Sequence, residues 1–208
     1  ITEVRTGAVS GVATDLLARK DAHHLAVIGA GAQGRSHLAA MMEVRDIQKV
    51  TVYDQRREAA KKYQKEMEEK YKIPVMVCDS VEEAVKGAEI ICTVTPSKEP
   101  YLKAEWITPG AHINAVGAFT PNTREIESSL MAKAKLYADQ VEAMKKECGE
   151  YLIPKNEGLF GEEHITGSIG GILAGQVPGR ENDTEITLFD ALGLAVEDVA
   201  CGRFLCRE

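Results

Sequence analysis

Long hydrophobic runs, basic clusters and cysteine pairs are missing from this sequence of 208 residues. No apolar stretch approaches the roughly 20 residues that span a bilayer. Acidic residues outnumber basic ones, 32 to 25, and the net charge is −7. Because nucleic acids and anionic membranes attract basic surfaces, we expect neither of them as a partner.

The cysteines and histidines show no metal-binding pattern. The five cysteines are an odd number and form no C-x-x-C pair, which favours reduced, mostly buried thiols. The five histidines have no ligand spacing with cysteines or carboxylates, so we expect no metal site. The printed sequence opens without a charged-then-apolar stretch, so we expect no leader and a cytoplasmic protein. The first residue is Ile1 rather than Met, so we also expect additional sequence upstream.

A glycine-rich turn follows an apolar run of strand length at residues 25–28. The turn places Gly29, Gly31 and Gly34 in the spacing G-x-G-x-x-G. In dinucleotide-binding proteins the first glycine allows a tight turn, the second lets the backbone approach a pyrophosphate, and the third lets the next helix pack closely. The helix expected at 32–44 would direct its free N–H groups at the phosphates.

An acidic residue stands at the distance that such a turn requires. A second apolar run, at 50–53, ends in Asp54, which is 20 residues beyond Gly34. An acid in this place accepts hydrogen bonds from the hydroxyl groups of an adenosine ribose. The sequence therefore predicts dinucleotide binding. The alternative interpretations are a glycine turn in another doubly wound sheet and the nucleoside loop of a methyltransferase.

Strand and helix signals alternate along the chain. This alternation predicts an α/β fold, a doubly wound parallel sheet of the Rossmann type flanked by helices on both faces. We expect one domain over residues 1–208, with a linking helix within 1–20 and a C-terminal helix within 190–208. The expected strands lie at 24–28, 49–53, 75–78, 89–94, 111–116, 135–138 and 185–189.

Several less regular features receive simpler interpretations. A short helix is expected within 165–175, and a loop at 148–163. Arg124 and Glu125 could frame a polar pocket, but a turn-stabilising role is favoured. His112 is expected to be a hydrogen-bonded structural histidine, because it lies in a strand.

Four sequence blocks carry a resemblance to a known family. They are V-R-T-G-A-V-S at 4–10, G-A-G-A-Q-G at 29–34, G-A-H-I-N-A-V-G at 110–117, and residues 189–199. In this order they resemble the ornithine cyclodeaminase/mu-crystallin family over nearly the whole chain. Family members have an additional N-terminal region that builds a homodimer and much of the substrate pocket, and this region is expected to be absent here.

The resemblance implies a set of binding residues. The arginine of the R-T pair, here Arg5, would hold the carboxylate of an amino or imino acid. Contacts with the cofactor are implied for Thr6, for Gly29, Gly31, Ala32, Gln33 and Gly34 in the phosphate turn, for Asp54 and Arg56 at the adenosine end, for Thr93, Val94 and Thr95 after the fourth strand, for Val116 and Ala118 beside the nicotinamide, and for Leu192 and Gly193 in the C-terminal turn.

The sequence departs from the family pattern at Phe119. Ornithine cyclodeaminases and the related archaeal alanine dehydrogenase carry a catalytic aspartate there, whereas mu-crystallin, a ketimine reductase, does not. Phenylalanine cannot transfer a proton, so it would only line the substrate pocket, and the catalytic residues stay unknown. The resemblance therefore implies an NAD(P)H-dependent oxidoreductase of small cyclic imino or amino acids. An ornithine cyclodeaminase and a non-catalytic binding protein are the alternatives.

Two neighbouring residues have opposite effects on the choice of cofactor. Asp54 would hydrogen-bond the ribose hydroxyls of NAD and repel the 2′-phosphate of NADP, whereas Arg56 could partly neutralise that phosphate. Asp54 is nearer to the ribose. We therefore expect NAD(H) to be preferred, with NADP(H) as a second cofactor that the site could accept.

Overall fold

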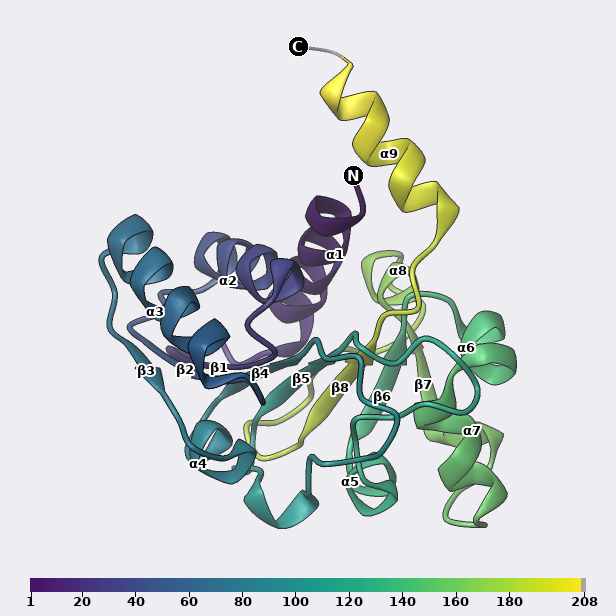
Figure 1. The fold of residues 1–208 in the computed structure, drawn as a ribbon. Coiled ribbons are helices and arrows are strands. Elements are labelled where there is room, and N and C mark those ends of the chain that lie inside the picture. The colour runs from purple at the N-terminus through teal and green to yellow at the C-terminus, as the bar shows by residue number, and fades with distance from the viewer. Residues whose placement is uncertain (207–208) are drawn as a thin grey trace.

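The computed structural model describes residues 1–206, which form an eight-stranded, all-parallel sheet (Figure 1). Its strand order is β3-β2-β1-β4-β5-β8-β6-β7. This arrangement confirms the predicted α/β fold with a doubly wound parallel sheet. The strands are β1 (His24–Ile28), β2 (Lys49–Tyr53), β3 (Val75–Val77), β4 (Ile90–Thr93), β5 (His112–Ala115), β6 (Lys135–Ala138), β7 (Ile165–Ser168) and β8 (Thr187–Asp190).

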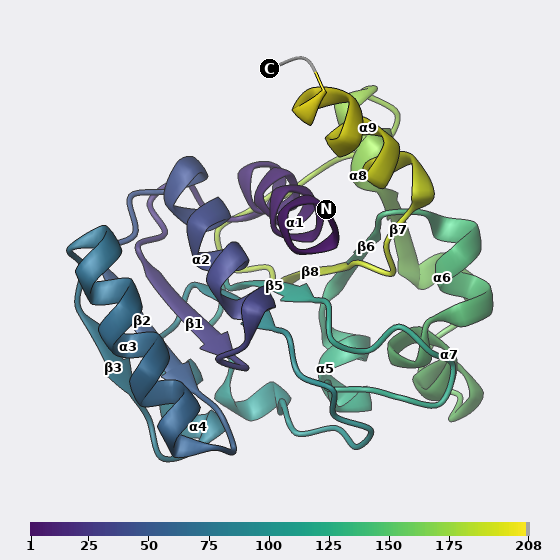
Figure 2. The same cartoon turned by 45° about the horizontal axis from the view of Figure 1, so that its top comes forward.

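Helices cover both faces of the sheet. One face carries α1 (Thr2–Leu17), α2 (Ala32–Val44), α3 (Arg57–Tyr71) and α8 (Ile169–Leu173), and α1 and α2 pack side by side over it (Figure 2). The core of the other face includes side chains from α4 (Val81–Val85), α5 (Ser128–Lys133), α6 (Val141–Glu147) and α7 (Gly149–Asn156). Short 3₁₀ turns occupy Ala104–Trp106 and Glu162–His164, and α9 (Ala195–Leu205) extends away from the sheet and contacts α1 (Figure 1).

The strands are buried on both faces, which explains their nearly continuous apolar sequences. In β1, Leu25 and Val27 pack against the core under α2 and α3, whereas Ala26 and Ile28 face the core under α4 and α5. Successive side chains of a strand point to opposite faces, so one short apolar run serves two cores. In residues 1–206, no helix combines the length and the apolar character that crossing a membrane requires.

The region after β6 differs from the sequence prediction. The expected helix within 165–175 is present as α8, but Ile165–Ser168 forms an eighth strand beside β6. The prediction of a loop at 148–163 was wrong, because Gly149–Asn156 is helical. Tertiary packing overrides weak helix propensity there: a Cβ on Gly149 would lie 2.2 Å from the Thr123 carbonyl oxygen, and Pro154 is buried inside the helix.

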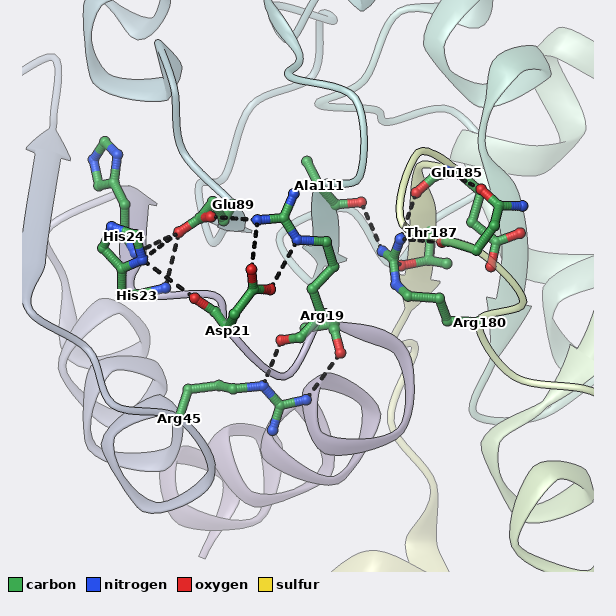
Figure 3. A network of polar contacts seen from close by, with 12 residues as sticks. Arg19, Asp21, His23, His24, Arg45, Glu89, Ala111, Arg180, Glu185 and Thr187 are labelled. Atoms are coloured by element: carbon green, nitrogen blue, oxygen red, sulfur yellow. Dashed lines mark hydrogen bonds and ion pairs between the residues drawn. The ribbon is translucent and has the colours of Figure 1, made fainter.

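A polar network stabilises the end of the sheet where the strands begin (Figure 3). The Arg45 side chain is buried and donates hydrogen bonds to the carbonyl oxygens of Thr14, Ala18 and Arg19. Arg180 donates to the carbonyl oxygens of Leu17, Glu185 and Ala111 and to the Thr187 hydroxyl. Carbonyls at a helix C-terminus lack helical partners. The two arginines therefore fix the end of α1.

Candidate functional site

Five neighbouring strands, β2, β1, β4, β5 and β8, end at the same level. The Cα register pairs Ile28 with both Tyr53 and Thr93, pairs Thr93 with Ala115, and pairs Ala115 with Asp190. Between β1 and β4 the strand order changes direction. In open α/β sheets, ligands bind in the crevice outside the carboxyl ends of the strands at such a switch point. Most of the predicted site residues follow these strand ends, whereas Arg5 and Thr6 lie in α1.

The glycine turn has the shape of a phosphate cradle. Gly29 has φ +111°, and a Cβ there would lie 2.8 Å from the Val94 carbonyl oxygen. A Cβ on Gly34 would lie 2.3 Å from the Gly29 carbonyl oxygen. A Cβ on Gly31, in contrast, would meet no atom within 4 Å. Gly31 is the N-cap residue of α2, makes no side-chain cap hydrogen bond and lines a pocket. Free N–H groups at the start of a helix are a common binding site for phosphates.

Asp54 is held in a fixed orientation beside this turn. Its Oδ2 accepts a hydrogen bond from the Ala30 N–H at 2.9 Å, and its Oδ1 accepts one from the Arg56 N–H at 2.8 Å. The Arg56 side chain is 81% exposed, with Nε 3.8 Å from Oδ1. Asp54 lines a pocket of about 400 Å³, called here the adenosine pocket, formed by Ile28, Gly29, Gly31, Tyr53, Asp54, Gln55, Arg56, Val81, Val94, Thr95, Pro96, Ser97 and Tyr101.

A second pocket, of about 460 Å³, adjoins the first at Val94, Thr95 and Pro96. It brings together Arg5 from α1 and Phe119 from the loop after β5, two residues that the sequence analysis assigned to the substrate. We call it the substrate pocket. Its lining consists of Thr2, Arg5, Thr6, Gln33, Val94, Thr95, Pro96, Val116, Gly117, Phe119, Ala191 and Leu192.

Arg5 is held by acidic residues at the start of α9. Its Nη1 lies 3.1 Å from Glu197 Oε2, and its Nε lies 3.2 Å from Asp198 Oδ1. Gly193 packs against the guanidinium, because a Cβ there would lie 2.5 Å from Nη1. Burial raises the pKa of Glu197. Neither acid was predicted from the sequence, since nearly the whole chain separates them from Arg5. The contact of Gly193 with the cofactor stays a prediction, and the structure adds its contact with Arg5.

Several predicted residues lie near the pockets without lining them. Thr93 and Ala118 are buried, Gly34 lies beneath the glycine turn, and Ala32 occupies the first turn of α2. Of these residues, Thr93 and Ala118 have buried side chains, whereas Ala32 is exposed. Among residues 1–206, no group of three or more His, Cys, Asp or Glu side chains is arranged to hold a metal ion.

His112 is structural, as predicted. Its Nδ1 lies 2.9 Å from the Thr187 hydroxyl, and its Nε2 lies 3.3 Å from the Asn114 side-chain oxygen. Complete burial lowers its pKa to about 3, so the ring is neutral at physiological pH. It lies at the start of β5, far along the strand from the pockets.

Asp190 lies buried at the carboxyl end of β8. The Cys148 thiol donates a hydrogen bond to its Oδ2 at 3.2 Å, whereas its Oδ1 has no partner within the part of the chain that the structure describes. Burial raises the pKa of Asp190 from its ordinary value of 3.8 to about 8, and the nearby acids Asp139 and Glu125 act in the same direction. The folded state therefore favours the neutral carboxyl group.

This raised pKa predicts a loss of stability as pH increases. Above its ordinary pKa the unfolded chain has released the Asp190 proton while the folded chain retains it, so the free energy of unfolding falls by up to about 1.4 kcal/mol per pH unit from this group. We expect the free energy of unfolding of Asp190→Asn, measured by urea unfolding, to fall less steeply between about pH 5 and pH 8 than that of the wild type. Parallel curves for the two proteins would contradict the assignment.

Comparisons with known proteins identify relatives of this chain. The sequence model of the ornithine cyclodeaminase/mu-crystallin family matches residues 1–207. The chain is 41% identical over 206 residues to the Delta(1)-pyrroline-2-carboxylate reductase of Bacillus cereus, which is 99% of this chain and 63% of that protein. It is 40% identical over 205 residues to the ketimine reductase mu-crystallin of Mus musculus, covering 99% of this chain and 61% of that protein.

A solved structure shows the same fold. The Delta(1)-pyrroline-2-carboxylate reductase of Thermococcus litoralis, in complex with NADH and L-proline, superposes with a TM-score of 0.95 at 44% identity, covering 97% of this chain and 62% of that one. This chain thus spans less than two thirds of the length of these relatives. With its four sequence blocks, its fold and the match over residues 1–207, the chain belongs to the ornithine cyclodeaminase/mu-crystallin family.

Proposed function

We propose that residues 1–208 form a single dinucleotide-binding domain of an NADH-dependent reductase. Its substrate would be a small cyclic imino acid of the pyrroline-2-carboxylate class. One observation carries the proposal: a pocket with a cationic carboxylate anchor, Arg5, and an apolar wall, Phe119, adjoins the crevice formed by the glycine turn and Asp54. The relatives that reduce pyrroline-2-carboxylate and ketimines support this choice.

The cofactor contacts predicted from the sequence are part of the proposal. Gly29, Gly31 and the start of α2 would hold the pyrophosphate, and Asp54 would accept hydrogen bonds from the ribose hydroxyls. Gln33, Val94, Thr95 and Leu192 line the substrate pocket, where the nicotinamide would meet the imino acid. When bound there, NADH supplies the hydride that the reduction consumes.

Arg5 keeps donors available for a substrate carboxylate. A guanidinium has five N–H groups, and the contacts with Glu197 and Asp198 use one at Nη1 and the one at Nε. The second Nη1 hydrogen and those of Nη2 can bind a carboxylate in two places. Because α9 fixes the guanidinium, little freedom is lost when the substrate binds.

The substrate pocket is suited to reduction rather than to deamination. The part of it that residues 1–206 form contains no Asp, Glu, His or Lys side chain. Deaminating an amine requires a base to remove an ammonium proton. A protonated cyclic iminium is already electrophilic, so Arg5 has to orient the carboxylate, and apolar groups such as Val116 and Phe119 have to exclude water around the reacting carbon.

The stoichiometry of the cofactor tests the proposal. The protein that contains this chain, supplied with NADH and pyrroline-2-carboxylate, should consume one NADH for each proline formed. Ammonia release from ornithine with a catalytic amount of cofactor would instead establish a cyclodeaminase. Tight NADH binding without turnover of any cyclic imino acid would establish a non-catalytic binding protein.

A substitution at Phe119 separates an apolar wall from a catalytic position. Phe119 is 64% exposed, so we expect Phe119→Leu to keep kcat/KM for imine reduction within about twofold, the range of an exposed substitution worth about 0.5 kcal/mol. Phe119→Asp should not create efficient ornithine deamination by itself. A folded, NADH-binding leucine variant without imine reduction would contradict this view of the pocket.

We also propose that the full-length protein is a homodimer that binds a small imino or amino acid. Exposed apolar side chains on α9, namely Val196, Val199 and Phe204, are consistent with burial in an assembly. Sedimentation velocity of the full-length protein would show a monomer if this proposal is wrong.

A further inference from the structure

Glu125 lies below the junction of the two pockets and is completely buried. Its Oε1 accepts three hydrogen bonds, from the Thr95 N–H at 2.8 Å, the Thr95 hydroxyl at 2.5 Å and the Tyr101 hydroxyl at 2.7 Å. Its Oε2 accepts one from the Gly117 N–H at 2.9 Å, and this N–H is shared with the more distant Thr93 carbonyl oxygen at 3.2 Å. One carboxylate thus joins the loop after β4 to the loop after β5.

These partners lie in different pockets. Tyr101 lines the adenosine pocket, Gly117 lines the substrate pocket, and Thr95 lines both. The loops approach each other closely, because a Cβ on Gly117 would lie 2.1 Å from the Thr95 carbonyl oxygen and 2.6 Å from Glu125 Oε1. A change at Glu125 must therefore alter the spacing of the two loops.

The carboxylate is itself held firmly. The Glu125 N–H donates to Glu150 Oε1 at 2.5 Å, and the Ile126 N–H donates to Glu150 Oε2 at 3.2 Å. The Glu125 carbonyl oxygen accepts from the N–H groups of Tyr101 and Leu102. Backbone and side chain are both anchored, so the position of Glu125 can determine that of the loops.

We propose that Glu125 is a positioning residue that fixes the loop after β5 against the loop after β4, and so aligns the nicotinamide end of the cofactor with the imino acid. This role of Glu125 rests on the proposed function, because hydride transfer requires the nicotinamide to be aligned with the imino acid. Reaction rates are sensitive to such placement, since reacting atoms must meet at near-contact distance. Glu125 does not line either pocket, so it acts through Thr95 and Gly117.

Replacement by glutamine should release one loop and not the other. An amide offers one acceptor oxygen and one NH₂ donor group. With the oxygen at the Oε1 position, the three donors from Thr95 and Tyr101 keep their partner. The NH₂ group then faces the Gly117 N–H, and two donors meet. Glu125→Gln is therefore expected to loosen the substrate side while it preserves the adenosine side.

Binding of ADP-ribose and of NADH distinguishes the two sides. ADP-ribose lacks the nicotinamide, so its Kd for Glu125→Gln should stay within about twofold of the wild type. The Kd for NADH should rise and kcat should fall, each by about fivefold, or about 1 kcal/mol. The KM for NADH should rise with its Kd. Titration calorimetry and steady-state kinetics of the protein that contains this chain give these values.

Two further variants complete the test. Glu142→Gln makes the same chemical change at an exposed side chain outside both pockets and should alter neither affinity. Tyr101→Phe removes a donor on the adenosine side and should change both affinities by the same factor, which provides a test even if Glu125→Gln does not fold. If Tyr101→Phe alters NADH binding alone, the proposal is overturned.

The remaining outcomes are also decisive. Equal losses of NADH and ADP-ribose affinity in folded Glu125→Gln, or no change in either affinity or in kcat, would overturn the proposal. If the wild type does not reduce any cyclic imino acid, the proposed function fails, and the ratio of the NADH and ADP-ribose affinities still tests the role of Glu125 in positioning the loop.

Discussion

Arg5→Ala is expected to raise the KM for the imino acid by about 30- to 100-fold, equal to about 2–3 kcal/mol, because two charge-assisted hydrogen bonds to the carboxylate are lost. The affinity for NADH should stay nearly unchanged, because the proposal assigns Arg5 to the carboxylate of the imino acid and to no group of the cofactor. Arg5→Lys should not restore binding, because an ammonium group cannot make the two-pronged contact. Steady-state kinetics and NADH titration measure both quantities.

A structural role for Arg5 would give a different result. Arg5 joins α1 to Glu197 and Asp198 of α9, so its loss could instead displace α9. In that case substrate and cofactor affinity would fall together, and the carboxylate assignment would be wrong. Arg203→Ala, which removes a charge from an exposed position of α9, is the matched control and should change neither constant.

Asp54→Asn is expected to abolish a preference for NADH. In the wild type, NADH should be favoured over NADPH by about tenfold or more, about 1.4 kcal/mol, because the carboxylate repels the 2′-phosphate. The N–H groups of Ala30 and Arg56 hold both oxygens, so the carboxylate cannot turn away. The Arg56 guanidinium is largely exposed, and solvent weakens its attraction for the phosphate.

Affinities and kcat/KM for both cofactors test this prediction. The asparagine side chain of the variant would keep a hydrogen-bond acceptor without the charge, so the two cofactors should become nearly equal or reverse in order. A wild-type protein that favours NADPH would show that Arg56 determines the choice. Arg56→Ala is the companion variant, and it should weaken NADPH binding more than NADH binding.

The glycine turn and Asp54 could be located from the sequence because their signals are local. Gly29, Gly31 and Gly34 follow one strand directly, and Asp54 follows the next. Parallel strands in register then bring these residues to one edge of the sheet, together with Thr95 and Val116. Short-range patterns and one topology rule are therefore sufficient to locate these residues.

Other parts of the site depend on contacts between distant segments. The sequence indicated a turn residue at Glu125, and only the folded chain shows its carboxylate between two strand-end loops. Glu197 and Asp198 meet Arg5 across nearly the whole sequence. The helix α7 and the strand β7 have weak local propensity, so tertiary packing determines them.

The fate of the transferred hydrogen tests the central claim most directly. NADH that carries deuterium at its transferable position should be mixed with pyrroline-2-carboxylate and the protein that contains this chain, and the product analysed by mass spectrometry and NMR. The expected product is proline with one deuterium at Cα for each NADH consumed. Proline without deuterium, or no product despite bound NADH, would contradict it.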